Sequence, residues 1–297
     1  MSRKSLLVYG SIILAMLFWS FSFVWTKIVY LAYNPITTVF LRLVISSVLL
    51  FAIGKGFKKL GRIEKKDRLS ILALAFFEPF LYFLGESFGL KYVSSTIGAV
   101  IISTIPLFSP IAAYYFHKEK LGKMNILGIL ISFIGVAIII FSKSLSLIVS
   151  PIGLTCLFIA VGSAVAYSVV LKKLAAKYNP LTLVTYQNTL GLIYFLPLFL
   201  ILDWRHFIQA VPTLEVLTAL ILLAVFGSTL AFICFTNGLN HLGITKSNIF
   251  INVIPVFTAI FAYFVIDEIL SFQKIAGMMV VIGGLFLSQI KFNRKAV

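Results

Sequence analysis

The chain has 297 residues, of which 61% are hydrophobic and 11% are charged, and its formal net charge is +16. A soluble protein of this size could not bury so much apolar surface, so the composition excludes that class and indicates a helical membrane protein. The positive residues fall in loops, which is a topology signal rather than a nucleic-acid-binding stripe. The two cysteines and three histidines have no disulfide or metal-binding spacing, and we expect no cofactor and no metal.

The apolar runs predict an all-α integral membrane protein with ten transmembrane helices. The first five are expected at about 6–30, 36–52, 69–90, 94–116 and 124–141. The second five are expected at about 152–171, 180–202, 214–239, 245–266 and 272–290. A polar link separates the two sets, so we predict two five-helix domains, at 1–141 and 151–290.

The two halves repeat one another at one constant offset. The matched pairs are Gly89 and Gly238, Leu90 and Leu239, Thr96 and Thr245, Pro106 and Pro255, Glu119 and Glu268, Leu121 and Leu270, Gly128 and Gly277, and Gly135 and Gly284. Such a run without a gap indicates a duplicated unit. The glycines spaced seven apart lie on one helix face, where we expect them to let helices approach closely.

Lys and Arg give the predicted orientation. One set of loops holds Arg3, Lys4, Lys55, Lys58, Lys59, Arg62, Lys65, Lys66, Arg68, Lys118, Lys120, Lys123, Lys172, Lys173, Lys177, Lys291, Arg294 and Lys295. The other set holds Lys91, Lys143, Arg205 and Lys274. We therefore expect both termini in the cytoplasm. Because each unit has five helices, the second is inverted relative to the first, an arrangement that recurs in secondary transporters.

Several motifs occur in a characteristic order. Trp19 lies in an aromatic first helix, Asn34-Pro35 leads to Arg42, and Gly89-Leu90-Lys91-Tyr92 is followed by Pro106. Repeated Glu-x-Leu turns and glycine-rich fifth and tenth helices follow. Together these features resemble the EamA-type transporters of the drug/metabolite transporter superfamily, over nearly the whole chain. The resemblance implies transport of small solutes across the cytoplasmic membrane, often export of amino acids or other metabolites, and leaves the substrate open.

Charged groups inside apolar helices are costly and are therefore functional candidates. Glu78 lies halfway along the third helix, and Tyr82 and Glu86 follow on the same face. We expect Glu78 and Tyr82 to line the substrate pathway, the alternative for Glu78 being a protonated carboxyl that only contacts a neighbour. Glu86 lies nearer the outer end, at a depth similar to Arg42 and Lys27. We expect an outer ion pair or gate there, the alternative being separate contacts with the interface.

Helix one presents Trp19, Ser22 and Thr26 on one face, which favours cavity lining over packing alone. Four amides within apolar runs add further pathway candidates: Gln187, Asn237, Asn248 and Asn252. Such amides either join helices or bind a solute. Pro106 and Pro255 remove backbone hydrogen bonds, so we expect helix kinks that border a cavity, and a hinge role stays open.

The sequence contains no HExxH or Walker motif, so we expect no enzyme. The sequence predicts a multi-pass secondary transporter of the inner cell membrane that exports small organic metabolites, with amino acids or related amphipathic solutes as the favoured substrates. The predicted mechanism is alternating access around a central cavity. Its partners are a small-molecule substrate and lipid, and not nucleic acid; the sequence does not fix the oligomeric state. The alternatives are a multidrug or cation efflux carrier and a non-transporting receptor or scaffold.

Overall fold

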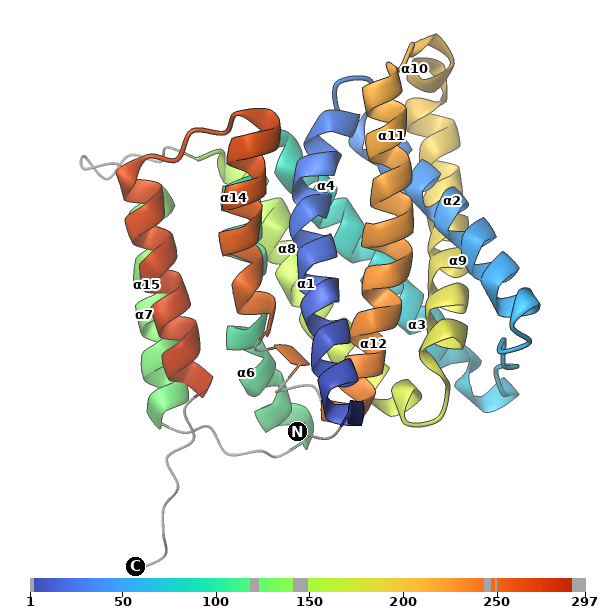
Figure 1. The fold of residues 1–297 in the computed structure, drawn as a ribbon, viewed down its shortest axis with the longest axis horizontal. Helices are drawn as coiled ribbons and strands as arrows, with labels where there is room; N and C mark the ends of the chain where they lie inside the picture. The colour runs from blue at the N-terminus through green and yellow to red at the C-terminus, as the bar shows by residue number, and fades with distance from the viewer. Residues whose placement is uncertain (1–2, 118–122, 141–148, 243–246, 249, 290–297) are drawn as a thin grey trace, which may run out of the picture.

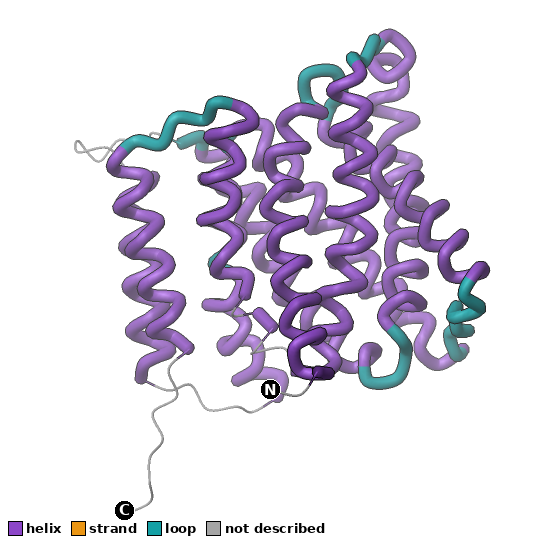
Figure 2. The backbone as a smooth tube through the Cα atoms, viewed as in Figure 1, coloured by secondary structure: helices purple, strands orange, loops and turns teal. Residues whose placement is uncertain are grey.

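The computed structural model describes residues 3–117, 123–140, 149–242, 247–248 and 250–289. Every regular element within these ranges is a helix (Figure 1, Figure 2). Six helical segments are long and apolar enough to cross a membrane: Leu7–Val29, Pro35–Gly56, Lys65–Tyr92, Pro151–Ala175, Pro180–Gln209 and Leu214–Leu242. Four shorter apolar helices accompany them: Ser95–Ser109, Ile126–Ile139, Phe250–Ile266 and Phe272–Gly284. The chain is therefore a multi-pass, all-helical membrane protein.

The helices follow the order expected from the sequence, with several expected helices divided into parts. The first half contains α1 (Arg3–Val29), α2 (Pro35–Gly56), α3 (Arg68–Ala75), α4 (Tyr82–Tyr92), α5 (Ser95–Ile102), α6 (Ile105–His117) and α7 (Lys123–Ile140). The second half contains α8 (Pro151–Ala175), α9 (Pro180–Leu198), α10 (Trp204–Gln209), α11 (Leu214–Leu222), α12 (Ala231–Leu242), α14 (Ile254–Ile266) and α15 (Phe272–Gln289).

Wide π-helical turns interrupt the third predicted helix of each half at matching positions. Phe76–Leu81 joins α3 to α4, and Leu223–Leu230 joins α11 to α12. Within the first turn, Glu78 has an extended backbone (φ −146°, ψ 119°). Such turns inside helices often mark functional positions, because they change the direction of side chains and leave backbone carbonyl groups without their helical hydrogen bonds.

Both predicted proline kinks fall beside a break in a helix. Pro106 is the second residue of α6, directly after the turn at Ser103 and Thr104. Pro255 is the second residue of α14, directly after the short 3-10 turn Phe250–Val253. A proline in the first turn of a helix costs no internal hydrogen bond, because the N–H groups there have no partner in the helix.

The two halves interlock. α4 packs on α8, and its counterpart α12 packs on α1, while α2 packs on α9 (Figure 1). Glycines allow the close approach: a Cβ on Gly85 would lie 2.5 Å from the Cys156 carbonyl oxygen, and one on Gly238 would overlap Ile12. The contact of α4 with α8 therefore recurs as the contact of α12 with α1, the helices at the matching positions of the sequence repeat.

The helices α7 and α15 form a separate pair at one edge of the molecule (Figure 1). A Cβ on Gly135 would lie 2.6 Å from the Val281 nitrogen, and one on Gly284 would lie 2.6 Å from the Ser132 nitrogen. Ser132 Oγ also donates a hydrogen bond of 3.1 Å to the Val281 carbonyl. The expectation that these glycines permit close helix packing is confirmed.

Asp203 caps the start of α2. Helix α2 begins at Pro35, one residue before its expected start at 36, and the Asn34 side chain does not cap it. Asp203, at the end of the segment that follows α9, accepts hydrogen bonds from Thr37 N (3.0 Å) and Thr37 Oγ1 (2.8 Å). A carboxylate satisfies the free N–H groups and the positive end of the helix better than a neutral amide. Asp203 thereby joins α2 to the second half.

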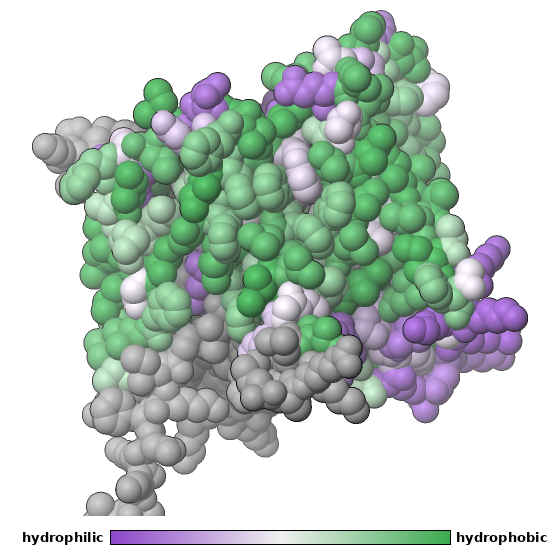
Figure 3. All heavy atoms as spheres, viewed as in Figure 1, coloured by the Kyte–Doolittle hydropathy of each residue, from purple (hydrophilic) through white to green (hydrophobic). Residues whose placement is uncertain are grey.

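Apolar side chains cover the flank of the molecule in Figure 3, and hydrophilic ones gather toward its two ends. The basic segment after α2 lies at one end, and α10, with Arg205, lies at the other (Figure 1). The Glu119-x-Leu121 turn, Thr245, Lys118, Lys120 and the basic residues after 290 lie outside the described residues, as does most of the polar link.

Candidate functional site

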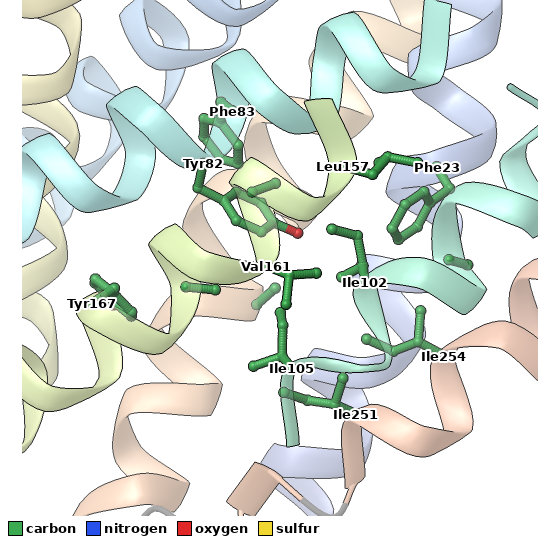
Figure 4. Close-up of a cluster of buried hydrophobic side chains, with 14 of the residues drawn as sticks. Phe23, Tyr82, Phe83, Ile102, Ile105, Leu157, Val161, Tyr167, Ile251 and Ile254 are labelled. Carbon is green, nitrogen blue, oxygen red and sulfur yellow. The ribbon is translucent and has the colours of Figure 1, made fainter. Parts of the chain in front are cut away.

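A cavity lies between the two halves. Its polar and aromatic lining comes from Trp19, Ser22, Phe23, Arg42, Glu78, Tyr82, Phe83, Glu86, Tyr167, Ser168, Phe232, Phe235 and Asn248. Isoleucines 102, 105, 251 and 254 line it near the Tyr82 ring (Figure 4). The cavity has a volume of about 50 Å³, which leaves room for only a few water molecules. An organic solute would therefore require the cavity to widen.

Arg42 is held in a fixed orientation on one wall. It is only 2% exposed, and its Nε donates a hydrogen bond of 2.7 Å to Ser228 Oγ. The guanidinium carbon lies 4.1 Å from the centre of the Phe83 ring, a cation–π contact. Behind it, Asn188 Nδ2 donates to the Ser228 carbonyl (2.9 Å) and to Ser46 Oγ (2.8 Å). These contacts join α2, α9 and the second π-helical turn around one cation.

The two carboxyl groups of the cavity have different surroundings. Glu86 accepts a hydrogen bond of 2.8 Å from the Tyr82 hydroxyl. Glu78 is 7% exposed, and its side chain makes no hydrogen bond or salt bridge within the described part of the chain. The Pro79 ring beside it packs against Gly191, where a Cβ would overlap the ring. Glu78 is thus a buried polar group that faces the cavity rather than a protein partner.

The repeat places glycines opposite the charged residues. The counterpart of Arg42 is Gly191, and the counterpart of Glu78 is Gly227. A Cβ on Gly227 would lie 3.6 Å from Arg42 Nη2 and 3.2 Å from Ser22 Cβ. Arg42 therefore abuts a glycine of the other half, and Pro79, next to Glu78, abuts another. The two halves differ in charge at these matched positions.

Seven of the sequence candidates meet in this cavity: Trp19, Ser22, Arg42, Glu78, Tyr82, Glu86 and Asn248. The structure does not bring the others to its wall. Thr26 is buried elsewhere on α1, and Asn237 is half-buried on α12. Gln187 lies behind the wall, where its Oε1 accepts a hydrogen bond of 3.1 Å from the Tyr167 hydroxyl. Asn252 is buried, and neither of its amide atoms forms a hydrogen bond with a residue that the structure describes.

The expected outer ion pair is not formed in this structure. Lys27 Nζ donates to the Leu90 carbonyl, and no described carboxylate lies within 4.0 Å of Lys27 or Arg42. Arg42 and Glu86 instead line the same cavity without touching. Thus the two groups are parts of the central site here, and a direct pair between them stays a proposal.

The sequence analysis missed the contribution of α8 and α12. Tyr167 and Ser168 line the cavity from α8, and Phe232 and Phe235 from α12. The repeat contains the signal that finds two of them, because Ser168 is the counterpart of Trp19 and Phe235 is the counterpart of Glu86. Applying the offset to each candidate of the first half would have identified these positions.

A network of charges joins the halves outside the spans. Lys177, between α8 and α9, lies 2.8 Å from Glu64 and 2.5 Å from Asp67, and the Tyr178 hydroxyl donates to Asp67 at 2.7 Å. Hydrogen bonding by Lys177 lowers the pKa of Glu64, and hydrogen bonding to Asp67 raises the pKa of Lys177. Within the described residues, no cluster of three His, Cys, Asp or Glu side chains could hold a metal ion.

Comparison with known proteins decides the family. The sequence model of the EamA-like transporter family matches residues 6–141 and again 151–289. The chain belongs to the EamA-like transporter family. This confirms the resemblance seen in the motifs, and the family domain is present twice.

Relatives of this EamA-like chain are named as transporters. The "uncharacterized transporter YetK" of Bacillus subtilis (strain 168) is 30% identical over 258 residues, covering 84% of this chain and 77% of that protein. An "uncharacterized transporter" of Archaeoglobus fulgidus is 28% identical over 280 residues, covering 94% and 96%. A solved crystal structure superposes with a TM-score of 0.69 over 96% of both chains at 15% identity, which supports the fold alone.

Proposed function

We propose that this EamA-like transporter is a secondary carrier that exports small organic metabolites. Amino acids and related amphipathic solutes are the favoured substrates. The observation that carries the proposal is the cavity between the halves, where Arg42, Glu78 and Glu86 are buried beside aromatic rings. Buried charges in a membrane protein are costly and commonly mark a solute pathway. Groups of both signs next to Trp19 and Phe232 suit a solute that is charged and apolar at once.

Alternating access would open the cavity to each side in turn. Its small volume here supports a cycle in which the helices move to admit the solute. In this proposal all ten apolar helices cross the inner cell membrane, both termini are cytoplasmic, and the halves 1–141 and 151–290 are inverted copies. The matched contacts of α4 with α8 and of α12 with α1 support that topology.

Roles for single residues follow from the same proposal. Trp19, Ser22, Glu78, Tyr82 and Asn248 would contact the solute, since all five line the cavity. Thr26, Gln187, Asn237 and Asn252 would act on the pathway only in another conformation. Lys27, Arg42 and Glu86 would form the outer gate when that end closes. Pro106 and Pro255 would serve as the bends at which α6 and α14 tilt. The chain would carry solute without catalysing a reaction.

One observation favours a second candidate. The cavity holds two carboxyl groups, on Glu78 and Glu86, against one guanidinium, on Arg42. This balance suits the binding of an organic cation, as in a multidrug efflux carrier. A receptor or scaffold that does not transport is the other alternative.

Uptake by the purified protein in proteoliposomes tests these functions. We expect accumulation of at least one radiolabelled amino acid from a panel of twenty, and none in vesicles without protein. Accumulation of tetraphenylphosphonium but of no amino acid would support cation efflux instead. Absence of uptake for all amino acids and cations, together with retained binding of a partner protein, would exclude the transporter.

A further inference from the structure

Arg42 is a buried cation that forms no direct ion pair with any carboxylate of the described residues. The nearest groups bonded to it are neutral, namely the Ser228 hydroxyl at 2.7 Å and the Phe83 ring at 4.1 Å. Glu86, which shares the cavity, is hydrogen-bonded to Tyr82 instead. A charge that is removed from water is destabilised by the loss of its hydration unless a direct counter-ion compensates for that loss. Such a group is suited to take its counter-ion from a ligand.

The hydrogen bonding of Arg42 also fixes which of its atoms are available. Ser228 occupies Nε, and no Nη atom donates to a described residue. Nη2 lies beside Gly227, where a Cβ would be 3.6 Å from it, so no side chain at this position covers that end of the guanidinium. A guanidinium held in this way presents a planar pair of donors, the geometry that binds a carboxylate through two hydrogen bonds.

The orientation of Ser228 is itself fixed by α9. Asn188 donates to the Ser228 carbonyl (2.9 Å), and Ser46 Oγ, on α2 like Arg42, lies 2.8 Å from Thr229 Oγ1. The repeat shows that this polar contact is specific to one side. The counterparts of Ser46 and Thr229 are Phe195 and Phe80, whose rings pack edge to face with centres 5.2 Å apart. Only the side that carries Arg42 has hydroxyl groups at these positions.

We propose that Arg42 is a subsite for the carboxylate of the transported solute, and that Ser228, supported by Asn188, is its positioning residue. The inference rests on the proposed function, because it assigns the end of the cavity that binds the acidic group. Ser228 acts through the bond to Nε and does not itself need to touch the solute.

Nuclear magnetic resonance of the full chain in lipid nanodiscs, with ¹⁵N-labelled arginine, tests the subsite directly. The Nε–H signal of Arg42 is the one that Arg42→Lys removes. Titration with L-phenylalanine should shift this signal with saturation, and L-phenylalaninamide, which lacks the carboxylate, should bind at least about tenfold more weakly. Inorganic phosphate distinguishes a general anion site from a carboxylate site.

Variants separate positioning from simple stability. Ser228→Ala should speed hydrogen exchange at Nε and weaken L-phenylalanine binding about tenfold, and Ser228→Thr, which keeps the hydroxyl, should restore both. The matched control is Ser132→Ala, which removes a buried hydroxyl between α7 and α15 and should change neither. The proposal is overturned by equal binding of acid and amide, by a response to phosphate alone, by no response, or by equal effects of Ser228→Ala and the control.

The outcome is distinct from that of the uptake test. If the protein takes up a solute but its Arg42 signal does not shift with L-phenylalanine, the subsite proposal is wrong and the transporter proposal is retained. Carboxylate-selective binding without uptake of any solute supports the subsite and removes the transport proposal.

Discussion

Arg42 of the first half lies against Gly227, the residue that stands in the second half where the first has Glu78. The converse contact joins Pro79, next to Glu78, to Gly191, which stands where the first half has Arg42. One duplicated helix contact therefore carries a cation and its copy carries a carboxyl group. Specificity in this carrier would come from these departures from symmetry, and movement from the symmetric frame.

Gly227→Ala should impair transport without unfolding the protein. The added Cβ would lie 3.2 Å from Ser22 Cβ and 3.6 Å from Arg42 Nη2, so it narrows the space beside the guanidinium. We expect uptake to fall about tenfold, as for roughly 1.4 kcal/mol of lost binding. Gly162→Ala on α8 is the control, because a Cβ there meets nothing within 4 Å. Equal uptake by the two variants would contradict the crowding argument.

Glu78→Gln should uncouple transport from a proton gradient if Glu78 carries a proton through the cycle. The motivation is a buried carboxyl in the cavity without a hydrogen-bond partner among the described residues. We expect exchange of labelled for unlabelled solute to persist and accumulation driven by a pH gradient to be lost. Glu215→Gln, at an exposed position on α11, serves as the control. Gradient-driven accumulation that survives in Glu78→Gln would rule out this role.

Gly284→Ala should destabilise the pair of α7 and α15. The new Cβ would lie 2.6 Å from the Ser132 nitrogen and 2.7 Å from the Gly128 carbonyl, both backbone atoms that cannot rotate away. Overpacking of this kind costs about 1–3 kcal/mol. The adjacent Gly283→Ala, with open space around its Cβ, should be neutral or slightly stabilising. Thermal unfolding in detergent measures the stability of both variants. Equal unfolding midpoints for Gly284→Ala and Gly283→Ala would show that α7 and α15 can move apart to accommodate the added Cβ without loss of stability.

Lys177→Met should lower the thermal midpoint near neutral pH by removing the partner of Glu64 and Asp67. Because the pKa of Glu64 is lowered in the folded protein, its contribution is present above the unfolded pKa and is lost as pH falls through the folded value. The difference in midpoint between wild type and Lys177→Met should therefore shrink in acid. The exposed Lys173→Met is the control. A difference that stays constant down to acid would exclude the carboxylates as its source.

The sequence predicted the elements well because strong local signals define them. The apolar runs gave the starts of α2 and α9 within one residue, and a proline lies in the first turn of both helices. The ninth expected helix differs, because its expected start at 245 lies outside the described residues and α14 begins at Ile254. The breaks inside helices were harder to predict. Pro106 and Pro255 indicated two of them, but the π-helical turn at Gly227 has no proline and depends on packing against α2.

The sequence located the site only in part. Helical spacing grouped Tyr82 and Glu86 on one face of α4, since that relation is local, and Glu78 lines the same cavity although its backbone is extended. It could not show that Arg42 reaches the same cavity, or that Gln187 lies behind Tyr167, because these relations join helices far apart in the chain. Lipid is as apolar as a protein core, so the hydrophobic pattern does not mark which face of a membrane helix points inward.

By itself, the sequence determined the class, the duplication and the family of this protein. The composition is that of a membrane protein, and the constant offset that relates Gly89 to Gly238 shows that one sequence unit occurs twice. Only the tertiary structure decided that Arg42 abuts Gly227, that Asp203 caps α2 and that the central cavity takes in Arg42 and Glu86, two of the three charged groups of the expected gate. The physical reason is that spacing along one helix fixes a face, whereas the partner of that face is chosen by packing between helices.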